Sequence, residues 1–565
     1  MRFPRKVNYC LLAVLVLVTV LARYPTSADH EMGSDTTFIN SLANSIVQDG
    51  YAKWILHPTS IFGLYALSYP SAAPFILSMG SEVSGISVEG LILILGIVLA
   101  IAGAISAYLL AKNIRDSDVF AHSVALLFTL APFYVKDTTW VASSRGFVVA
   151  ILPFFLLLLV RHMRTKDLRY LLLALAVFVV LSSIHRMGLL SILILIAYLL
   201  AVPLHMVTQR LRFTLSKFEK PFRYAALGIS VAAFLGIFYV QFVFPGISGA
   251  NVVEQYTNGA LFTGSSFPVL LVNMAVSLVG RVGFLLPLVP IGLFAYAWKR
   301  PKESTDKFLL LVTLTFLPLL SLRDYISEFL IPVFVILAVM GVLTLVKMVR
   351  NRRQLGAVLF AGFLLTSCVF SWVTKDHWRE SYVTDGPIPK PVYDVALYIR
   401  VSAWGTILTN AGLTGGRIAA ISGLPNMPLG GASTHIQSAQ QLTWDFVDPN
   451  TLAVRLMDLT QISFNTDSIY IAVNVDNVEE LWETVLIYQK TGEANRIMSE
   501  YRVHFIATEN DIFPTYSSYG LNRASCLLGT DPLCQPGNVL PDNNYVVYTN
   551  SEVTLWLARG GPPDR

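Results

Sequence analysis

The chain has 565 residues, of which 54% are hydrophobic and only 14% are charged, against about a quarter charged in soluble domains. This composition excludes an ordinary soluble protein, and the mean hydropathy of +0.59 indicates a membrane protein. The formal net charge of +5 is small, and no nucleic-acid partner is expected.

Apolar segments recur along the first two-thirds of the chain, and a helical span needs roughly 20 such residues. They lie at 91–111, 118–135, 147–160, 170–184, 188–206, 224–243, 282–298, 308–322, 329–346 and 355–373. Residues 9–22 form a further, shorter segment, which gives about eleven spans. Residues 2–22 would also fit a cleaved signal peptide, but no clean small-residue cleavage site precedes Arg23-Tyr24-Pro25, so a retained helix is favoured.

Lysine and arginine residues are unequally divided between the loops. Alternate loops, beginning with the N-terminus, hold 22 of them, whereas the other loops up to residue 373 hold 7. Because cytoplasmic loops are enriched in these residues, we expect a multi-pass protein of the plasma membrane. Its N-terminus would be cytoplasmic and its tail after residue 373 extracytoplasmic.

The first external loop, residues 23–85, is predicted to contain an amphipathic helix in the membrane interface. Apolar residues recur at helical spacing from Phe38 to Val47, polar residues fill the other face, and Gly50 follows as a stop signal. Asp35 lies at the N-terminal end of this helix. Its carboxylate is either a helix cap, contributing about 0.5–2 kcal/mol, or a functional acid.

The tail has a different composition from the preceding membrane domain, which covers residues 1–374. Residues 375–565 are enough for one extracytoplasmic α/β domain. Strands are predicted at 406–409, 417–421, 468–473 and 503–507, a helix at 477–500, a hairpin at 545–559 and a plain turn at 412–416. Cys526 and Cys534 flank a turn-rich loop, where a local disulfide and two free thiols are both open.

The external loops carry a small set of charged residues near the membrane, where charge is costly and often functional. Besides Asp35, the set comprises His30, Glu31, Asp137, Arg145, Glu254 and Arg323. A carboxylate can deprotonate an acceptor hydroxyl or hold a divalent cation, and an arginine can clamp a phosphate. The set suits transfer of a group from a phosphorylated lipid, although caps, ion pairs, headgroup contacts and solvated loop residues are the plainer interpretations.

Three of these segments resemble parts of the GT-C superfamily of polytopic glycosyltransferases, which use polyprenyl-phosphate sugars. Gly33-Ser34-Asp35 with the following helix and Gly50-Tyr51 resembles the first external loop of that family. Ser321-Leu322-Arg323-Asp324-Tyr325 resembles the start of its late span, and Val252-Val253-Glu254-Gln255 is similar to the external-loop Glu motif of oligosaccharyltransferase catalytic subunits. The Trp-Trp-Asp-Tyr-Gly signature of those subunits is absent.

The resemblance covers residues 1–373 and implies an α-helical, polytopic GT-C-like fold. It implies that Asp35 is the base or a ligand of a divalent cation such as Mg²⁺ or Mn²⁺, and that Arg323 contacts the donor phosphate. Arg145, which opens a span, is a second phosphate-binding candidate. The implied partners are the lipid bilayer, a polyprenyl-phosphate sugar donor and a glycan, lipid or protein acceptor.

Two other functions fit a polytopic protein: a transporter or flippase for a lipid-linked or small solute, and a non-enzymatic scaffold for cell-envelope assembly. Transporters tend to show internal repeats and polar residues at mid-membrane. This sequence shows no such repeat, and spans such as 147–160 and 329–346 contain no charged residue, which disfavours an ion-coupled pathway. About eleven spans also exceed what an anchor for a scaffold needs. We therefore expect a glycosyltransferase that acts on the outer face of the membrane.

Overall fold

The computed structural model describes most of the first half of the chain and part of the second. The described residues are 2–25, 28–50, 61–62, 70–210, 228, 278–298, 303–321, 326–348, 353–381, 386–402, 406–409, 412–423, 426–428, 503–509, 545–549 and 553–557. The chain divides into two compact units that alternate along the sequence. The membrane unit comprises Met1–Tyr24, Leu95–Thr139 and Ser144–Ser381, and the mixed unit comprises Pro25–Ile94, Trp140–Ser143 and Tyr382–Arg565.

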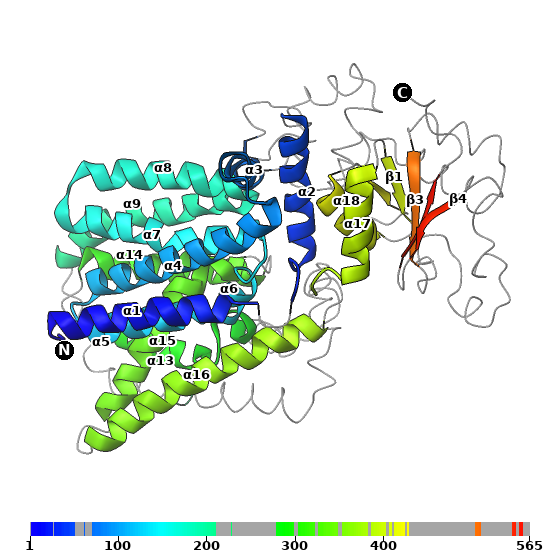
Figure 1. Ribbon diagram of the computed structural model, residues 1–565. Coiled ribbons are helices and arrows are strands. Elements are labelled where there is room, and N and C mark those ends of the chain that lie inside the picture. Colours follow the sequence, from blue (N-terminus) through cyan, green and yellow to red (C-terminus); the bar gives the residue numbers. More distant parts are fainter. Residues whose placement is uncertain are drawn as a thin grey trace, which may run out of the picture. The chain divides into compact units, whose positions relative to one another are not determined.

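The membrane unit is built from helices (Figure 1). They are α1 (Arg5–Arg23), α5 (Asp118–Thr129), α6 (Pro132–Lys136), α7 (Ser144–Thr165), α8 (Leu168–Ile184), α9 (Ser191–Arg210), α13 (Val289–Trp298), α14 (Ser304–Phe316), α15 (Ile326–Met348) and α16 (Arg353–Ser381), together with most of α4 (Val88–Ile114), which begins in the mixed unit. Three short 3-10 helices, η1 (Arg186–Leu190), η4 (Leu286–Leu288) and η5 (Pro318–Ser321), join them.

Within the described ranges, five helices are long and apolar enough to cross a membrane: α1, α4, α7, α15 and α16. Shorter apolar helices include α5 and α8. On α8, exposed apolar side chains at Leu168, Leu172, Leu175 and Val179 recur every three or four residues, as expected for a face that borders lipid. The polytopic, helical character predicted from composition is therefore confirmed. The number of spans stays a prediction, because all of the segment at 224–243 except residue 228 lies outside the described residues.

The helix α15 forms the buried centre of the membrane unit and packs most extensively on α13. Two glycines permit this approach. A Cβ at Gly292 of α13 would overlap the carbonyl oxygen of Leu337 in α15, and a Cβ at Gly341 of α15 would overlap that of Leu288, the last residue of η4 before α13. Small residues at a helix contact let two backbones come close, and transmembrane helices commonly pack in this way.

The continuous span predicted at 118–135 is wrong, because the helix is interrupted between α5 and α6. Pro132 is the first residue of α6, and Ala131 before it has an extended ψ of 125°. Proline lacks a backbone N–H and disfavours helical geometry in the preceding residue. The hydropathy of the segment is uniform and conceals this break.

The mixed unit combines helices with a five-stranded sheet. The helices are α2 (Ser34–Asp49), α3 (Ala72–Ser84), α17 (Lys390–Ser402) and α18 (Gly412–Ser422). The sheet order is β2 (Asn426–Pro428), β1 (Thr406–Thr409), β3 (Val503–Glu509), β5 (Val553–Leu557), β4 (Tyr545–Thr549), in which β1 is parallel to β2 and β3, and β5 is antiparallel to β3 and β4. The predicted strands at 406–409 and 503–507 and the hairpin are confirmed, whereas 468–473 and 477–500 lie outside the described residues.

The predicted strand at 417–421 and the predicted turn at 412–416 are both wrong, since one helix, α18, covers them. It connects the parallel strands β1 and β2, and such a connection has to cross over, usually through a helix. Ile418, Ala419, Ala420 and Ile421 are all buried. A short apolar run of this kind does not distinguish a buried helix from a buried strand.

The helix predicted in the first external loop is present as α2, and Gly50 ends it in the left-handed conformation, with φ of 74°. Both of its faces are covered, because α2 packs on α3 and α18. Asn44 Nδ2 donates to the carbonyl of Ala420 at 2.5 Å, and Gln48 Nε2 donates to that of Ser422 at 2.9 Å. The polar face of α2 therefore satisfies carbonyls at the C-terminal end of α18, which have no intrahelical partner.

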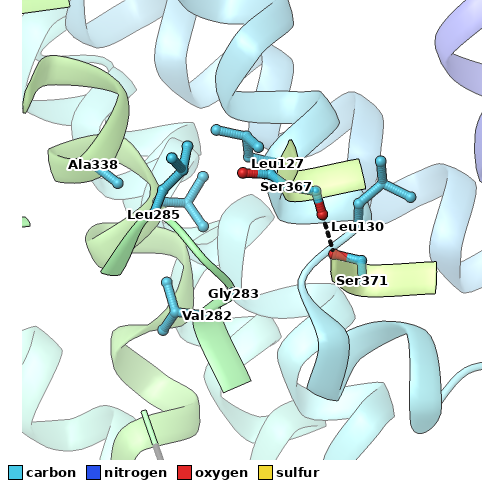
Figure 2. Close-up of a pocket in the computed structure, with 9 residues that line it drawn as sticks. Leu127, Leu130, Val282, Gly283, Leu285, Ala338, Ser367 and Ser371 are labelled. Atoms are coloured by element: carbon cyan, nitrogen blue, oxygen red, sulfur yellow. Dashed lines mark hydrogen bonds between the residues drawn. The ribbon is translucent and has the colours of Figure 1, made fainter. Parts of the chain in front are cut away.

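A small cavity lies in the membrane unit among α5, α15, α16 and the turn that precedes η4 (Figure 2). Its volume of about 10 Å³ is close to that of one water molecule. Ser371 Oγ donates to the carbonyl oxygen of Ser367 at 2.9 Å beside it. The cavity is too small for a sugar or a lipid headgroup, so the candidate functional site lies elsewhere.

Candidate functional site

The segment immediately before α2 is held in place by hydrogen bonds. Met32 N donates to the carbonyl of Trp140 at 3.1 Å, and Ile388 N donates to that of Glu31 at 3.2 Å. Thr36 Oγ1 accepts from Ala142 N at 2.9 Å and donates to the Met32 carbonyl. These bonds between distant parts of the mixed unit fix the start of α2.

Asp35 lies in the first turn of α2, where Gly33 with φ of 88° directs the chain into the helix. Its side chain is half-buried. The N-terminus of a helix favours negative charge, so this position suits an ionised carboxylate. Unlike Glu31, Asp35 keeps part of its surface open to a ligand.

Glu31 is only 1% exposed. Its Oε1 accepts from Asn40 Nδ2 at 2.7 Å, and its Oε2 makes no hydrogen bond with the part of the chain that the structure describes. Burial raises the pKa of this carboxyl well above its usual range; the Asn40 hydrogen bond opposes the rise, and the charge of Glu89 adds to it. The buried environment of Glu31 therefore favours its protonated form relative to that of an exposed carboxyl.

Glu89, in the first turn of α4, gathers the groups around Glu31. Its Oε1 accepts from Glu31 N at 3.3 Å and lies 3.1 Å from His30 Nδ1, and its Oε2 accepts from the Tyr393 hydroxyl at 3.0 Å. The rings of His30 and Tyr393 stack with centroids 3.6 Å apart. Burial, followed by the charge of Glu89, raises the pKa of Tyr393 to about 12.

Sequence reasoning included His30 and Glu31 but missed Glu89 and Tyr393. Glu89 precedes an apolar span and reads as an ordinary helix-terminal acid, and Tyr393 lies in the tail. In the structure, an unusual backbone conformation marks this site: Trp140 has φ of 51° although it is not glycine. Non-glycine residues rarely adopt such a φ, and they do so where the surroundings enforce it. Here the indole Nε1 donates to the Glu89 carbonyl at 3.1 Å.

In the membrane unit, Asp137 lies at the end of α6 and Arg145 lies in the first turn of α7. Asp137 is 3% exposed, and a Cβ at Gly146 would overlap its carbonyl oxygen. Arg145 Nη1 lies 3.9 Å from Glu328 Oε1 in the first turn of α15. The structure thus gives Arg145 a carboxylate neighbour that sequence reasoning did not identify.

The remaining predicted residues, Arg323, Glu254, Cys526 and Cys534, lie outside the described residues. Their predicted roles and the possible disulfide stay predictions. Within the described part of the chain, no group of three His, Cys, Asp or Glu side chains could hold a metal ion. Asp35 offers one oxygen ligand, and the described residues do not complete a cation site around it.

No family model matches the sequence, and no curated protein matches it. Solved structures are similar in fold. The apo oligosaccharyltransferase of Archaeoglobus fulgidus has a TM-score of 0.54 and 12% identity, over 90% of this chain and 70% of that chain. The same enzyme, AglB, with an inhibitory peptide and a dolichol-phosphate gives 0.51 and 11%, over 89% and 69%.

ArnT from Cupriavidus metallidurans, bound to undecaprenyl phosphate, aligns over almost the whole of both chains. Its TM-score is 0.51 at 14% identity, over 98% of this chain and 99% of that chain. At such identities the likeness concerns the fold. The protein has a GT-C-like fold and is a multi-pass membrane protein, as the resemblance in the first external loop implied.

Proposed function

We propose that the protein is a membrane glycosyltransferase that transfers a sugar from a polyprenyl-phosphate-linked donor to a glycan, lipid or protein acceptor on the outer face of the plasma membrane. The observation that carries the proposal is the half-buried Asp35 carboxylate at the start of α2, fixed by the contacts of Met32 and Thr36, in a chain with a GT-C-like fold. Two similar structures contain a dolichol-phosphate and undecaprenyl phosphate, which supports a donor of this class.

In this proposal Asp35 is the general base that removes a proton from the acceptor as the new glycosidic bond forms. Arg145 and Arg323 bind the donor phosphate, which leaves with the electrons of the broken bond and whose charge they stabilise. His30, Glu31, Asp137 and Glu254 support these groups. The tail, residues 375–565, is the extracytoplasmic domain that contributes to acceptor binding.

In this proposal the Asp35 carboxylate also offers a ligand to a divalent cation, Mg²⁺ or Mn²⁺. A hard cation of this kind requires several oxygen ligands, and the described residues supply no set of three. No step of the proposed reaction therefore depends on the cation. Transfer activity measured after chelation, and again after Mg²⁺ or Mn²⁺ is restored, tests its involvement.

The test of the proposed function compares Asp35→Asn with wild type in membranes that are supplied with labelled polyprenyl-phosphate sugars. We expect transfer to fall by roughly 100-fold or more, because the variant lacks the base. Asp29→Asn is the matched control, since Asp29 is an exposed acid of the same loop and its loss should leave transfer unchanged. Undiminished transfer in Asp35→Asn would remove Asp35 from the mechanism.

A further inference from the structure

Arg23, the last residue of α1, is fully buried in the membrane unit. Its Nε donates to Thr138 Oγ1 at 3.0 Å. The guanidinium carbon lies 4.9 Å from the centroid of the Tyr134 ring, which belongs to α6. The guanidinium is therefore held by contacts on one edge and one face.

The other edge of the guanidinium is unsatisfied. Nη1 and Nη2 make no hydrogen bond with any residue that the structure describes. Buried charges are normally paired, because removing a charge from water is costly. The cation–π contact and the negative end of α1 offset only part of this cost. A bound anion would supply the missing acceptors.

The geometry favours a phosphate group as this anion. The two Nη groups of an arginine form a planar fork that matches two oxygens of a phosphate. Thr138 already occupies Nε, so the orientation of the fork is fixed before a ligand arrives. A preorganised fork loses less entropy on binding than a flexible lysine would.

The surroundings of α1 indicate that the phosphate belongs to a lipid. Val14, Leu17 and Leu21 are exposed apolar residues at helical spacing, and Tyr24 continues this stripe at the end of the helix. Apolar residues that face outward along a span border acyl chains, and tyrosine favours the headgroup level. A lipid tail along this stripe would place its headgroup beside the end of α1.

Binding requires the groups that cover the Nη edge of Arg23 to move aside, because the guanidinium is enclosed. The bond from Nε to Thr138 stays in place during this movement and keeps the fork oriented. The buried residues of α1 are confined to Leu15, Thr19, Ala22 and Arg23. Regions with few buried contacts open more readily than the core does, so we expect the surroundings of Arg23 to open at a lower cost than the α13–α15 pair.

We propose that Arg23 binds the phosphate of a lipid at the end of α1, a role additional to those proposed above for Arg145 and Arg323. Two sources share this chemistry: a polyprenyl phosphate and a bilayer phospholipid such as phosphatidylglycerol. The site does not depend on sugar transfer, so it stands even if the glycosyltransferase proposal fails.

The test measures the affinity of the full-length protein, in a phosphate-free detergent, for polyprenyl phosphate, phosphatidylglycerol and inorganic phosphate. Arg23→Gln removes the charge, and Arg23→Lys keeps the charge but removes the fork. We expect both to weaken lipid binding by about tenfold or more. Arg169→Gln, which removes an exposed arginine of α8, is the matched control and should bind like wild type.

Selective binding of polyprenyl phosphate supports a lipid-phosphate site that takes a polyprenyl phosphate. Equal binding of both lipids supports a lipid-phosphate site that also accepts a bilayer phospholipid. If Arg23→Gln does not fold, Arg23→Lys decides the outcome. Wild-type affinity in Arg23→Lys overturns the proposal, because Arg23 would then be a structural cation over Tyr134. Inorganic phosphate that binds as tightly as the lipids overturns the lipid assignment.

Discussion

At the scale of single residues, the buried Glu31 carboxyl makes the mixed unit sensitive to pH. One of its oxygens is satisfied by Asn40, and burial holds its pKa well above the usual range. The folded protein therefore retains a proton at pH values where the unfolded chain has lost it. Stability that depends on this proton is fully present below the unfolded-state pKa and is lost as pH rises through the folded-state pKa.

Glu31→Gln should remove this pH dependence, because the amide keeps the shape and the Asn40 contact but does not ionise. For each unit by which the pKa is raised, about 1.4 kcal/mol of stability is lost when the pH exceeds the folded-state pKa. We expect the difference in unfolding temperature, variant minus wild type, to become larger from pH 5 to pH 8. Glu82→Gln is the control, since Glu82 is an exposed acid of the same unit. A difference that does not change with pH would contradict the assignment.

At the scale of elements, α13 and α15 depend on two glycines for their close packing. The overlap at Gly292 and at Gly341 is in each case with a backbone carbonyl oxygen, which cannot rotate away as a side chain can. The helices would have to separate to admit even a methyl group. This contact holds the most buried helix of the membrane unit in position.

Gly292→Ala and Gly341→Ala should each destabilise the protein by about 3 kcal/mol, at the upper end of the cost of overpacking. The measurement is the midpoint of unfolding in a mixed detergent titration. Gly362→Ala in α16 is the control, because nothing lies within 4 Å of a Cβ at that position. Equal midpoints for all three variants would show that α13 and α15 can separate at little cost.

The elements also show how far the sequence predicts this fold. The long helices follow from their hydropathy, and α2 follows from its period and from Gly50. The predictions at 118–135 and 417–421 failed because hydropathy does not detect the break at Pro132 or the crossover that makes α18 a helix. In the candidate site, Asp35 and Glu31 could be named from the sequence. The backbone bonds that hold this segment come from Trp140 and Ile388, which are distant in sequence and could not be identified.

At the scale of the whole molecule, the unequal division of lysine and arginine predicts the orientation of the chain in the membrane. The predicted cytoplasmic regions include the junction of α7 and α8, where Arg164 lies at the end of α7, Lys166 lies between the helices and Arg169 lies at the start of α8. The predicted external parts include the first loop and α17. Orientation decides which side of the membrane supplies the donor and the acceptor.

Single cysteines introduced into a cysteine-free background test this orientation. Asp29→Cys and Lys390→Cys occupy exposed positions of the first loop and of α17, and Arg169→Cys occupies an exposed position near the start of α8. We expect a membrane-impermeant maleimide to label the first two variants in intact cells and to label Arg169→Cys only after permeabilisation. Labelling of Arg169→Cys in intact cells would reverse the predicted topology.

The hydrogen bond from Asn44 to the Ala420 carbonyl joins residues 376 positions apart. Ribosomes add about 5–20 residues per second, so α2 leaves the ribosome on the order of tens of seconds before its partner α18 exists. During that interval the bonds from Asn44 and Gln48 to the carbonyls of α18 cannot form, and within α2 Asn44 has Asn40 as a partner. The first loop therefore completes its structure only near the end of biosynthesis, and premature termination before α18 would leave α2 without that partner.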